Sequence, residues 1–528
     1  MKPVSRRLHT SKPVTNRAGA TQVYTINSWE QLDRFLILGT SENTYYATAK
    51  ELTAEQAKNL LGVLTLDGKR VVDRIVEIST SGRAPKNDPA LFALAVAATY
   101  GDEATKKYAL SKLSDVARIG THLFHFVNYI GRGDSKLRGW GRQLRTAVAN
   151  WYLEKKGNAL ELQLTKYQSR DGWSHRDVIK LAHPKPDMPQ SIALGWAVDS
   201  AKILASIPPA KLAEVTPLIA AYEEVKSTSN EKRLIKLITD YRLPMELIPT
   251  EKRSVAVYEA VLHNLNIEAL IRQLPTLTKA GIFANSAEAL KYAENIIKNP
   301  ELLKKGRIHP IKVLAAYKTY SSGHSLKGDG SWTPQPKLTN ALNDAFYLSF
   351  EAVEPTGKRF MLGVDVSGSM WWSESAVLGN PSLHAADVAA AMALATAKRE
   401  SNYYIAGFDH DFTDLQISPN DTLERVFKRM QSISHGGTNA SIPILFALRA
   451  KIPVDAFVTY TDNETWAGPA PMASLEIYRQ TMGIDAKLIA VATSATNYSI
   501  ADGPGTLNLC GFDSAAPGII SDFATNGF

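Results

Sequence analysis

The sequence predicts two folded parts, an α-helical array over residues 25–355 and a doubly wound α/β domain over residues 356–528, preceded by a basic tail at residues 1–24. Apolar residues recur at helical spacing through the first two-thirds of the chain, whereas buried-strand patterns of any extent begin only at residue 360. Charge divides at the same place. Residues 356–528 hold 11 basic and 17 acidic side chains, whereas residues 1–355 hold 49 basic and 35 acidic side chains.

The helical part is marked by amphipathic segments joined by short connections that contain Gly, Pro, Asn or Asp. These segments are 57–78, 89–100, 105–118, 121–129, 142–155, 159–168, 191–206, 210–225, 229–241, 254–264, 267–276, 287–297, 309–320 and 338–352. So many helices of similar length favour an α-solenoid of paired helices, with an irregular helical domain as the alternative. A strand-like patch lies at residues 22–26. Residues 1–20 contain no acid, and we expect a disordered basic tail there rather than an arm that grips RNA.

The α/β domain is predicted from residues 360–364, an apolar run typical of a buried central strand. Oxygen-bearing side chains follow at alternate positions and should converge beyond the carboxyl end of the strand, where ligands bind in open α/β sheets. They are Asp365, Ser367 and Ser369, joined by Thr438 in a Gly-rich loop and by Asp462 at the end of a second apolar strand. Hard oxygen ligands suit Mg²⁺, with Ca²⁺ or Mn²⁺ as further possibilities, and not zinc. The alternative is a serine-rich helix entry without an ion.

A polar segment at residues 140–186 combines basic side chains with Tyr and Trp. Ser174 and Asp177 form the pattern of a helix N-cap with its reciprocal acid, and Pro184 predicts the end of that helix near His183. Basic groups beside aromatic rings suit phosphates and unstacked bases, although a solvated face over core aromatics gives the same pattern. The candidates for RNA contact here are Arg142, Arg145, Lys166, Arg170, His175, Arg176 and His183.

Several function classes are disfavoured by composition. The single cysteine, Cys510, precludes a disulfide framework and favours a reducing compartment, and there is no apolar run of membrane-spanning length and no secretory signal, so we expect a cytoplasmic protein. We find no Walker lysine loop, no HExxH motif and no carboxylate pair with a general acid, and His435 is the only base near Thr438. We therefore expect a protein that is not an enzyme, and a metal-dependent phosphohydrolase is the least favoured alternative.

The five metal-ligand candidates resemble the metal-ion-dependent adhesion site of the von Willebrand factor A domain, whose pattern is Asp-x-Ser-x-Ser, a loop Thr and a later Asp. Longer segments resemble the Ro autoantigen family, in order from about residue 25 to the end. These are ILGTSENTYY (37–46), TKYQSRDGWSHRD (165–177), KGRIHPIKVLAAYKTYSSGHSLKG (305–328), EPTGKRFMLGVDVSGSM (354–370), TDNETWAG (461–468) and LNLCGFD (507–513). Gly368 stands where animal members carry Ala, which leaves the ligand positions intact.

The resemblance implies a ring of HEAT-like helical repeats closed by a von Willebrand A domain. Family members bind small noncoding Y RNAs on the outer basic surface, through positions that correspond to Lys166, Arg170 and His183. They also accept single-stranded 3′ ends of misfolded RNAs in a central hole, and the candidates for its wall are Arg307, His309, Lys312, His324 and Lys327. The alternative is that these residues cap helices and face bulk water.

Bacterial members of the family associate with exoribonucleases through Y RNA. We therefore expect a monomer that acts in the quality control or maturation of noncoding RNA. The competing hypothesis is a protein–protein adaptor whose metal site grips an acidic side chain, with RNA binding incidental. Trp371 and Trp372 would then provide a partner surface, although core packing explains them equally well.

Overall fold

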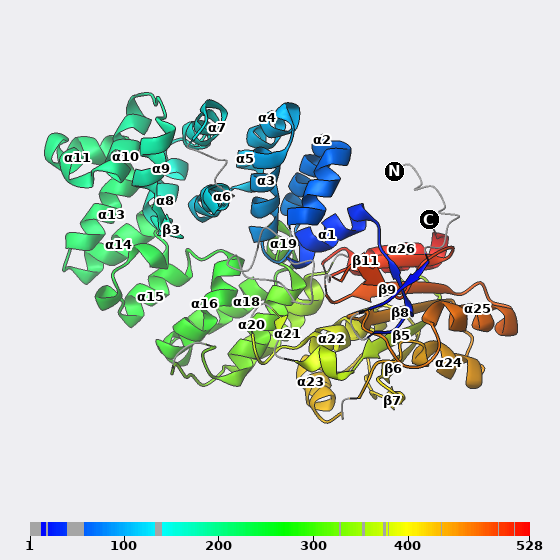
Figure 1. Ribbon diagram of the computed structural model, residues 1–528. Coiled ribbons are helices and arrows are strands. Elements are labelled where there is room, and N and C mark those ends of the chain that lie inside the picture. The colour runs from blue at the N-terminus through cyan, green and yellow to red at the C-terminus, as the bar shows by residue number, and fades with distance from the viewer. Residues whose placement is uncertain are drawn as a thin grey trace.

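The structure, a computed structural model, describes residues 12–16, 19–39, 57–132, 140–326, 329–350, 354–372, 376–377, 380–433, 436–494, 496–511 and 513–527. The predicted positions Lys327 and His435 lie outside these residues. Helices make up an arc that leaves the C-terminal domain at one side and returns to it at the other (Figure 1). No helix within the described ranges is long and apolar enough to cross a membrane.

The arc consists of three successive groups of helices. The first contains α1 (Ser28–Leu38), α2 (Ala57–Ser81), α3 (Asp88–Tyr100), α4 (Glu103–Ser111), α5 (Leu113–Val116) and α6 (Gly120–Arg132). The second, farthest from the C-terminal domain, contains α7 (Arg142–Leu153), α8 (Asn158–Lys166), α9 (His175–Ala182), α10 (Met188–Val198), α11 (Ser200–Ser206), α12 (Pro209–Val215), α13 (Pro217–Ser227), α14 (Glu231–Tyr241) and α15 (Val255–Leu262). The third contains α16 (Ile267–Lys279), α17 (Ile282–Asn285), α18 (Ala287–Ile297), α19 (Pro300–Lys305), α20 (Pro310–Ser322) and α21 (Pro336–Leu348).

The helices predicted from periodicity are confirmed, but four of the predicted segments are interrupted. Segment 57–78 is kinked at Asp67, whose backbone is not helical, and three others are each divided into two helices. Segment 191–206 breaks at Asp199, whose extended backbone ends α10 while its side chain caps α11. Segment 210–225 breaks at Thr216, because the following Pro217 disfavours helical backbone at the residue before it. Segment 105–118 breaks at Lys112. Helix α1 was not predicted, although Asn27 and Glu30 form a capping box at its start.

The C-terminal domain is built on a six-stranded sheet of order β11-β9-β8-β5-β6-β7. Its strands are β5 (Arg359–Asp365), β6 (Asn402–Phe408), β7 (Phe412–Asp414), β8 (Ala456–Thr461), β9 (Lys487–Ala492) and β11 (Thr506–Cys510). Strand β5 is central and pairs in parallel with both β6 and β8, which confirms the predicted buried strand.

Both faces of this sheet are covered by helices. Leu362 and Val364 belong to the core that includes α22 (Ala385–Ala397) and α23 (Leu423–Gln431). Met361 belongs to the core that includes α24 (Ile442–Arg449) and α25 (Pro471–Met482). Helices on both faces of a mostly parallel sheet define a doubly wound domain, and they explain why residues 360–364 of β5 are all apolar.

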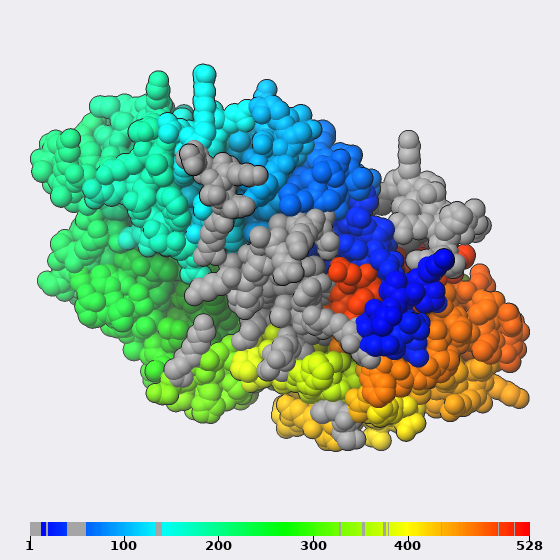
Figure 2. Space-filling model, viewed as in Figure 1, coloured from blue at the N-terminus to red at the C-terminus, as the bar shows by residue number. Residues whose placement is uncertain are grey.

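The N-terminal residues correct the expectation of a disordered tail where the structure describes them. β1 (Pro13–Val14) pairs with β2 (Val23–Thr25), and β2 pairs with β10 (Tyr498–Ser499) of the C-terminal domain. Asn16 is buried and donates from Nδ2 to the carbonyl oxygen of Thr465 at 2.5 Å. Figure 2 shows this blue segment lying on the orange and red C-terminal domain. Backbone pairing and a buried side-chain hydrogen bond fix a segment whose composition alone predicts disorder.

Contacts at both ends of the arc close it into a ring with the C-terminal domain. At the first end, the buried Arg34 of α1 donates from Nη1 to the carbonyl oxygens of Thr496, at 2.6 Å, and Tyr498, at 2.9 Å. At the second end, Lys318 of α20 is 3.5 Å from Asp387 of α22 and lies 3.8 Å from the centre of the Phe427 ring. The structure therefore has the predicted architecture, a helical ring completed by the α/β domain.

Candidate metal site and nucleic-acid interface

The predicted metal ligands lie together at the carboxyl edge of the sheet. Asp365 ends β5, and its carboxylate accepts hydrogen bonds from the Ser367 backbone N–H at 3.0 Å and from the Thr461 hydroxyl at 2.6 Å. The Ser367 and Ser369 hydroxyl oxygens are 3.3 Å apart. Asp462 directly follows the neighbouring strand β8, and Ser369 hydrogen-bonds to its carboxyl group. Two parallel strands thus bring two carboxylates and two hydroxyls to one place.

The loop that carries Thr438 is fixed beside this edge. Gly368 donates its backbone N–H to the carbonyl oxygen of Gly436 at 3.1 Å, which ties the loop to the turn after β5. The carbonyl oxygen of Thr438 accepts the backbone N–H of Trp466 at 3.0 Å, which ties it to the segment after β8. Thr438 itself is buried. The five predicted ligands therefore come from three segments that hydrogen bonds hold together.

The electrostatics of this edge suit a divalent cation. Burial raises the pKa of both the Asp365 and Asp462 carboxyl groups, and the nearby Asp462 raises that of Asp365 further. A bound cation would supply the missing opposite charge, and hydroxyl and carboxylate oxygens are the ligands that Mg²⁺ and Ca²⁺ accept. Within the described residues, no group of three or more His, Cys, Asp or Glu side chains is placed to hold an ion. This site differs because hydroxyls complete its donor set.

Two tryptophan side chains are exposed beside these ligands. Trp372 follows the short helix that carries Ser369, and 61% of it is exposed. Trp466 is 47% exposed, and its indole packs against Gly437 and the His410 ring. Trp371, by contrast, is half-buried against the His384 ring. Of Trp371 and Trp372, which directly follow the Asp-x-Ser-x-Ser motif, only Trp372 is therefore a surface residue.

A second cluster of predicted residues lies on the part of the ring farthest from the C-terminal domain. Trp140, before α7, is 6.4 Å from Trp173, before α9, measured between ring centroids. Helices α7 and α9 pack together, so their basic residues share one region of the ring. The exposed predicted side chains in this region are Arg142, Arg145, Arg170, Arg176 and His183.

Arg170 is displayed by a β-hairpin that the sequence analysis missed. β3 (Ser169–Arg170) pairs with β4 (Trp173–Ser174), and the two-residue turn of Asp171 and Gly172 has positive φ at both positions. The Asp171 carboxylate is 2.6 Å from Nδ1 of the buried His125, which anchors the hairpin to α6. The signal was present, because Asp-Gly is a strong marker of a two-residue hairpin turn.

Lys166 and His183 occupy helix ends as predicted, in different surroundings. Lys166 is the last residue of α8, is 19% exposed at its side chain, and lies 3.8 Å from Glu246. His183 is the left-handed C-cap of α9 and is exposed. The predicted capping box of Ser174 and Asp177 is confirmed at the start of the same helix.

Two predicted histidines are buried and have structural partners. His175 lies 2.8 Å from the Tyr152 hydroxyl and 3.0 Å from the carbonyl oxygen of Gln163, and burial lowers its pKa to about 4. His309 caps α20 by accepting the Ile311 N–H, and burial lowers its pKa to about 3. Since both rings are neutral and out of reach of solvent, we remove them from the proposed RNA contacts.

Arg118 and Arg307 lie close together where the first and third groups of helices meet, and Lys312 lies near His122 and is paired with Glu268 at 2.6 Å. Nε2 of His309 is 3.2 Å from the carbonyl oxygen of Arg83, so the α2–α3 connection touches the start of α20. Burial and the charge of Arg307 lower the pKa of the Arg118 guanidinium. Arg118 was not among the residues predicted from the sequence. Arg118 belongs to no sequence motif. Its proximity to Arg307 arises only when the ring closes, so the sequence alone did not identify it. His324, the remaining described candidate, is exposed after α20.

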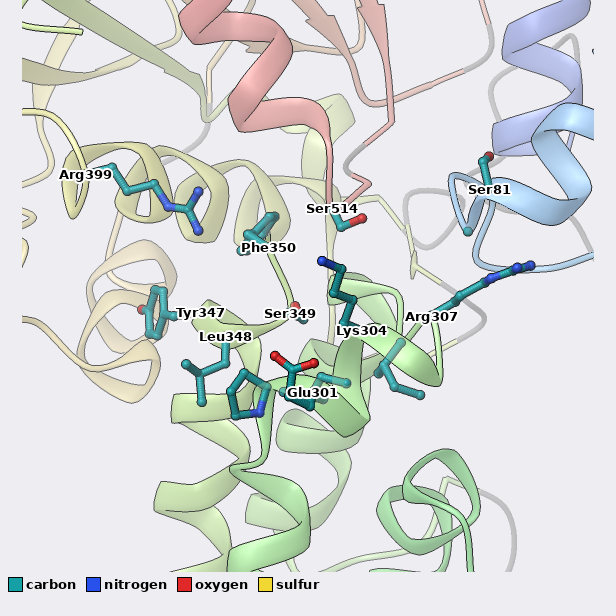
Figure 3. Close-up of a pocket in the computed structure, with 14 residues that line it drawn as sticks. Ser81, Glu301, Lys304, Arg307, Tyr347, Leu348, Ser349, Phe350, Arg399 and Ser514 are labelled. Atoms are coloured by element: carbon teal, nitrogen blue, oxygen red, sulfur yellow. The ribbon is translucent and has the colours of Figure 1, made fainter. Parts of the chain in front are cut away.

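A cavity of about 680 Å³ lies beside this closure, between α19, the end of α21 and the C-terminal domain. In Figure 3, Lys304 points into it toward Ser514, whereas Arg307 extends to the other side, toward Ser81. Arg307 therefore faces the first limb of the arc and not the joint between the domains.

This fold and site define a class of protein, a helical-repeat ring completed by a von Willebrand A-type domain with an Asp-x-Ser-x-Ser motif. Family models agree with both parts. The TROVE domain matches residues 14–324, and the Ro60 vWA domain matches residues 359–524. The chain belongs to the Ro60 family.

Full-length relatives support this assignment. The chain is 37% identical to "RNA-binding protein RO60" of Deinococcus radiodurans, over 99% of this chain and 97% of that protein. It is 30% identical to "RNA-binding protein RO60" of Caenorhabditis elegans, over 99% of this chain and 92% of that protein. The crystal structure of the Ro (RSR) protein of Deinococcus radiodurans matches with a TM-score of 0.72 and 36% identity, over 95% of this chain and all of that one.

Proposed function

We propose that this protein binds RNA in two ways, through the exposed basic region around α7, α9 and the β3–β4 hairpin and through the basic closure on the inner side of the ring. The observation that carries the proposal is the exposed cluster of Arg142, Arg145, Arg170 and Arg176, on a ring whose two full-length relatives are named RNA-binding proteins. Phosphate contacts from such side chains are electrostatic and independent of sequence.

The outer region is suited to a structured RNA. Its cations sit on helix ends and on an anchored hairpin, so they are presented at fixed spacing to a rigid phosphate backbone. Membership of the Ro60 family supports a Y RNA as that ligand, and it supports action with an exoribonuclease in the quality control or maturation of noncoding RNA. We propose both on that ground, together with a monomeric state.

The inner region is suited to a single strand. Arg118 and Arg307 repel one another at the closure, and a phosphate between them would relieve that repulsion. A flexible strand can follow a basic wall without base pairing, whereas a duplex is wider and stiffer. We therefore propose that single-stranded 3′ ends enter the ring.

Asp365, Ser367, Ser369, Thr438 and Asp462 would hold one divalent cation, with Mg²⁺ as the proposed ion. When bound, the ion supplies a positive charge and open coordination for an oxygen ligand. We assign the protein no catalytic step. A second candidate function, a metal-dependent adaptor for an acidic protein side chain, is favoured by the exposed Trp372 and Trp466 beside this site.

The test compares a hairpin RNA that has a single-stranded 3′ tail with the same hairpin made blunt-ended. We expect the tail to increase affinity, and we expect Arg118→Gln/Arg307→Gln to remove that increase while the blunt hairpin binds as before. Lys202→Gln/Lys232→Gln is the matched control, because it removes two exposed charges on α11 and α14, away from the closure. Equal affinity of the wild-type protein for both RNAs would contradict a single-strand mode.

A further inference from the structure

A second cavity, of about 360 Å³, lies between α16 and α20 and is mostly apolar. Ile271 and Pro275 line it from α16, and Ala315 and Ala316 line it from α20. Two consecutive alanines on α20 leave space that larger side chains would fill. Leu326 also lines the cavity and is 45% exposed, although it is a large apolar residue. Its size lies in the range of small-ligand pockets, about 300–1,000 Å³.

The polar residues that line this cavity are Glu268, Arg272, Lys312, Thr319 and Asn380. Pro275 lies inside α16 and has no N–H, so it cannot donate to the carbonyl oxygen of Ile271 four residues earlier. That oxygen therefore lacks its usual intrahelical donor, on a residue that lines the cavity. At the other edge, Asn380 of the C-terminal domain donates from Nδ2 to the Thr319 hydroxyl at 3.1 Å.

Two cations lie at the rim, and each is paired with an acid. Lys312 Nζ is 2.6 Å from Glu268, which also lines the cavity, and Arg272 is 3.5 Å from Glu246. Lys312, on the same stripe of α20 as Ala316, lies close enough to His122 of α6 to contribute to the lowered pKa of that histidine. Burial raises the pKa of Tyr167 at the end of α8, and Arg272, on the α16 side, lies close enough to oppose that rise. Because α6 belongs to the first group of helices and α8 to the second, this rim faces parts of the ring outside its own group.

We propose that this cavity takes one unstacked nucleobase from a single RNA strand inside the ring. The apolar floor suits the face of a base, and the Ile271 carbonyl oxygen suits an exocyclic amino group. The flanking phosphates would take Lys312 and Arg272 as partners in exchange for Glu268 and Glu246. The inference rests on the single-strand mode proposed above and adds a base contact to a site that would otherwise read only phosphates.

The test is a scan with abasic residues. The hairpin with a 3′ tail is prepared as a series in which each tail nucleotide in turn lacks its base, and binding is measured for the wild-type protein, for Ala316→Leu and for Ala213→Leu. Leucine at position 316 fills the cavity, whereas Ala213 is an exposed alanine on α12 and serves as the matched control. The scan on the wild-type protein needs no variant, so the proposal does not depend on how Ala316→Leu folds.

We expect one tail position, or two adjacent ones, at which loss of the base weakens binding on the order of tenfold, because stacking of one base contributes that much. The Ala213→Leu protein should keep this profile, and the Ala316→Leu protein should lose it and bind all tails equally. A flat profile in the wild-type protein, with tail-dependent affinity intact, would overturn the base pocket alone. A sensitive position that persists in Ala316→Leu would place the base elsewhere. If the tail added no affinity at all, the single-strand mode would fail as well.

Discussion

Replacing Asp365 by Asn is expected to abolish the response of the C-terminal domain to Mg²⁺ without damaging the fold. The substitution keeps the shape of the side chain. Asn Oδ1 can still accept the Ser367 N–H, and Asn Nδ2 can donate to the Thr461 oxygen that now donates to the carboxylate. What disappears is one of the two buried negative charges that a cation would neutralise. In the absence of Mg²⁺ the variant should be at least as stable as the wild-type protein, because the substitution removes the like charge beside Asp462.

The magnitude follows from linkage. An ion that binds only the folded state, at a concentration 100 times its dissociation constant, stabilises that state by about 2.7 kcal/mol. The von Willebrand A-type domain spans residues 359–524, and for a domain of this size each kcal/mol changes the melting temperature by roughly 2–4 °C. The wild-type domain should therefore melt about 5–11 °C higher with saturating Mg²⁺ than with EDTA. The Asp365→Asn variant should show no such difference.

The assay is calorimetry of the full chain with Mg²⁺ or EDTA, and the control is Asp485→Asn. Asp485 is 98% exposed at its side chain, so its loss changes the net charge equally without touching the site. Tailed-hairpin RNA binding should be nearly unchanged in Asp365→Asn. An equal Mg²⁺ response in the variant and the wild-type protein would locate the ion elsewhere. If the variant lost RNA affinity as well as the ion, the proposed separation of metal and RNA roles would be wrong.

Two further predictions concern the helical ring. Lys166→Ala and Arg170→Ala should each weaken binding of a structured RNA and reduce the slope of log affinity against log salt concentration by about one. Filter binding over a salt series measures this slope. An unchanged slope in the double variant would show that both residues belong to a solvated face. The buried His175 has its pKa lowered from 6.5 to about 4, so the unfolded chain takes up its proton first as the pH falls. The contribution of the neutral His175 to the free energy of unfolding is fully present above about pH 6.5 and is lost as the pH falls toward 4. About 2 kcal/mol of it is lost at pH 5. His175→Gln should reduce the pH dependence of the unfolding free energy, measured with denaturant between pH 7 and pH 5. If the variant keeps the pH dependence of the wild-type protein, the His175 imidazole is not held neutral in the folded state.

The convergence of the predicted metal ligands at one edge of the sheet could be predicted because it depends on local sequence rules. Residues 360–364 form a strand whose end places alternate side chains on one side, and Asp462 follows a second strand in the same way. Parallel pairing of β5 with β8 then brings both ends to one edge of the sheet. Each step needs only periodicity and the rule that ligands bind at that edge.

The inner surface was only partly predictable, because it depends on closure of the ring. Periodicity located the helices, but Arg118 and Arg307 are far apart in the chain and meet only after closure. Polarity alone also overstated the candidates, since His175 and His309 carry the residue types of a phosphate site but are buried hydrogen-bonding groups of the core. The hairpin at Asp171 was missed for another reason, a turn signal that was read only as the approach to a helix.

Ring closure and the C-terminal domain are linked through a few consecutive residues of α20. Lys318 contacts Asp387 at the start of α22, and the next residue, Thr319, accepts a hydrogen bond from Asn380. Asp387 also accepts the backbone N–H of His384, whose ring packs on Trp371 at the end of the short helix that carries Ser369. Lys318 is 10% exposed and Asp387 is 1% exposed at the side chain, so separating them would leave buried charge without a partner, which costs about 3–5 kcal/mol. Opening the ring at this joint would therefore require a compensating interaction for both charges, and the contacts of Asp387 and His384 connect the joint to the short helix that carries Ser369.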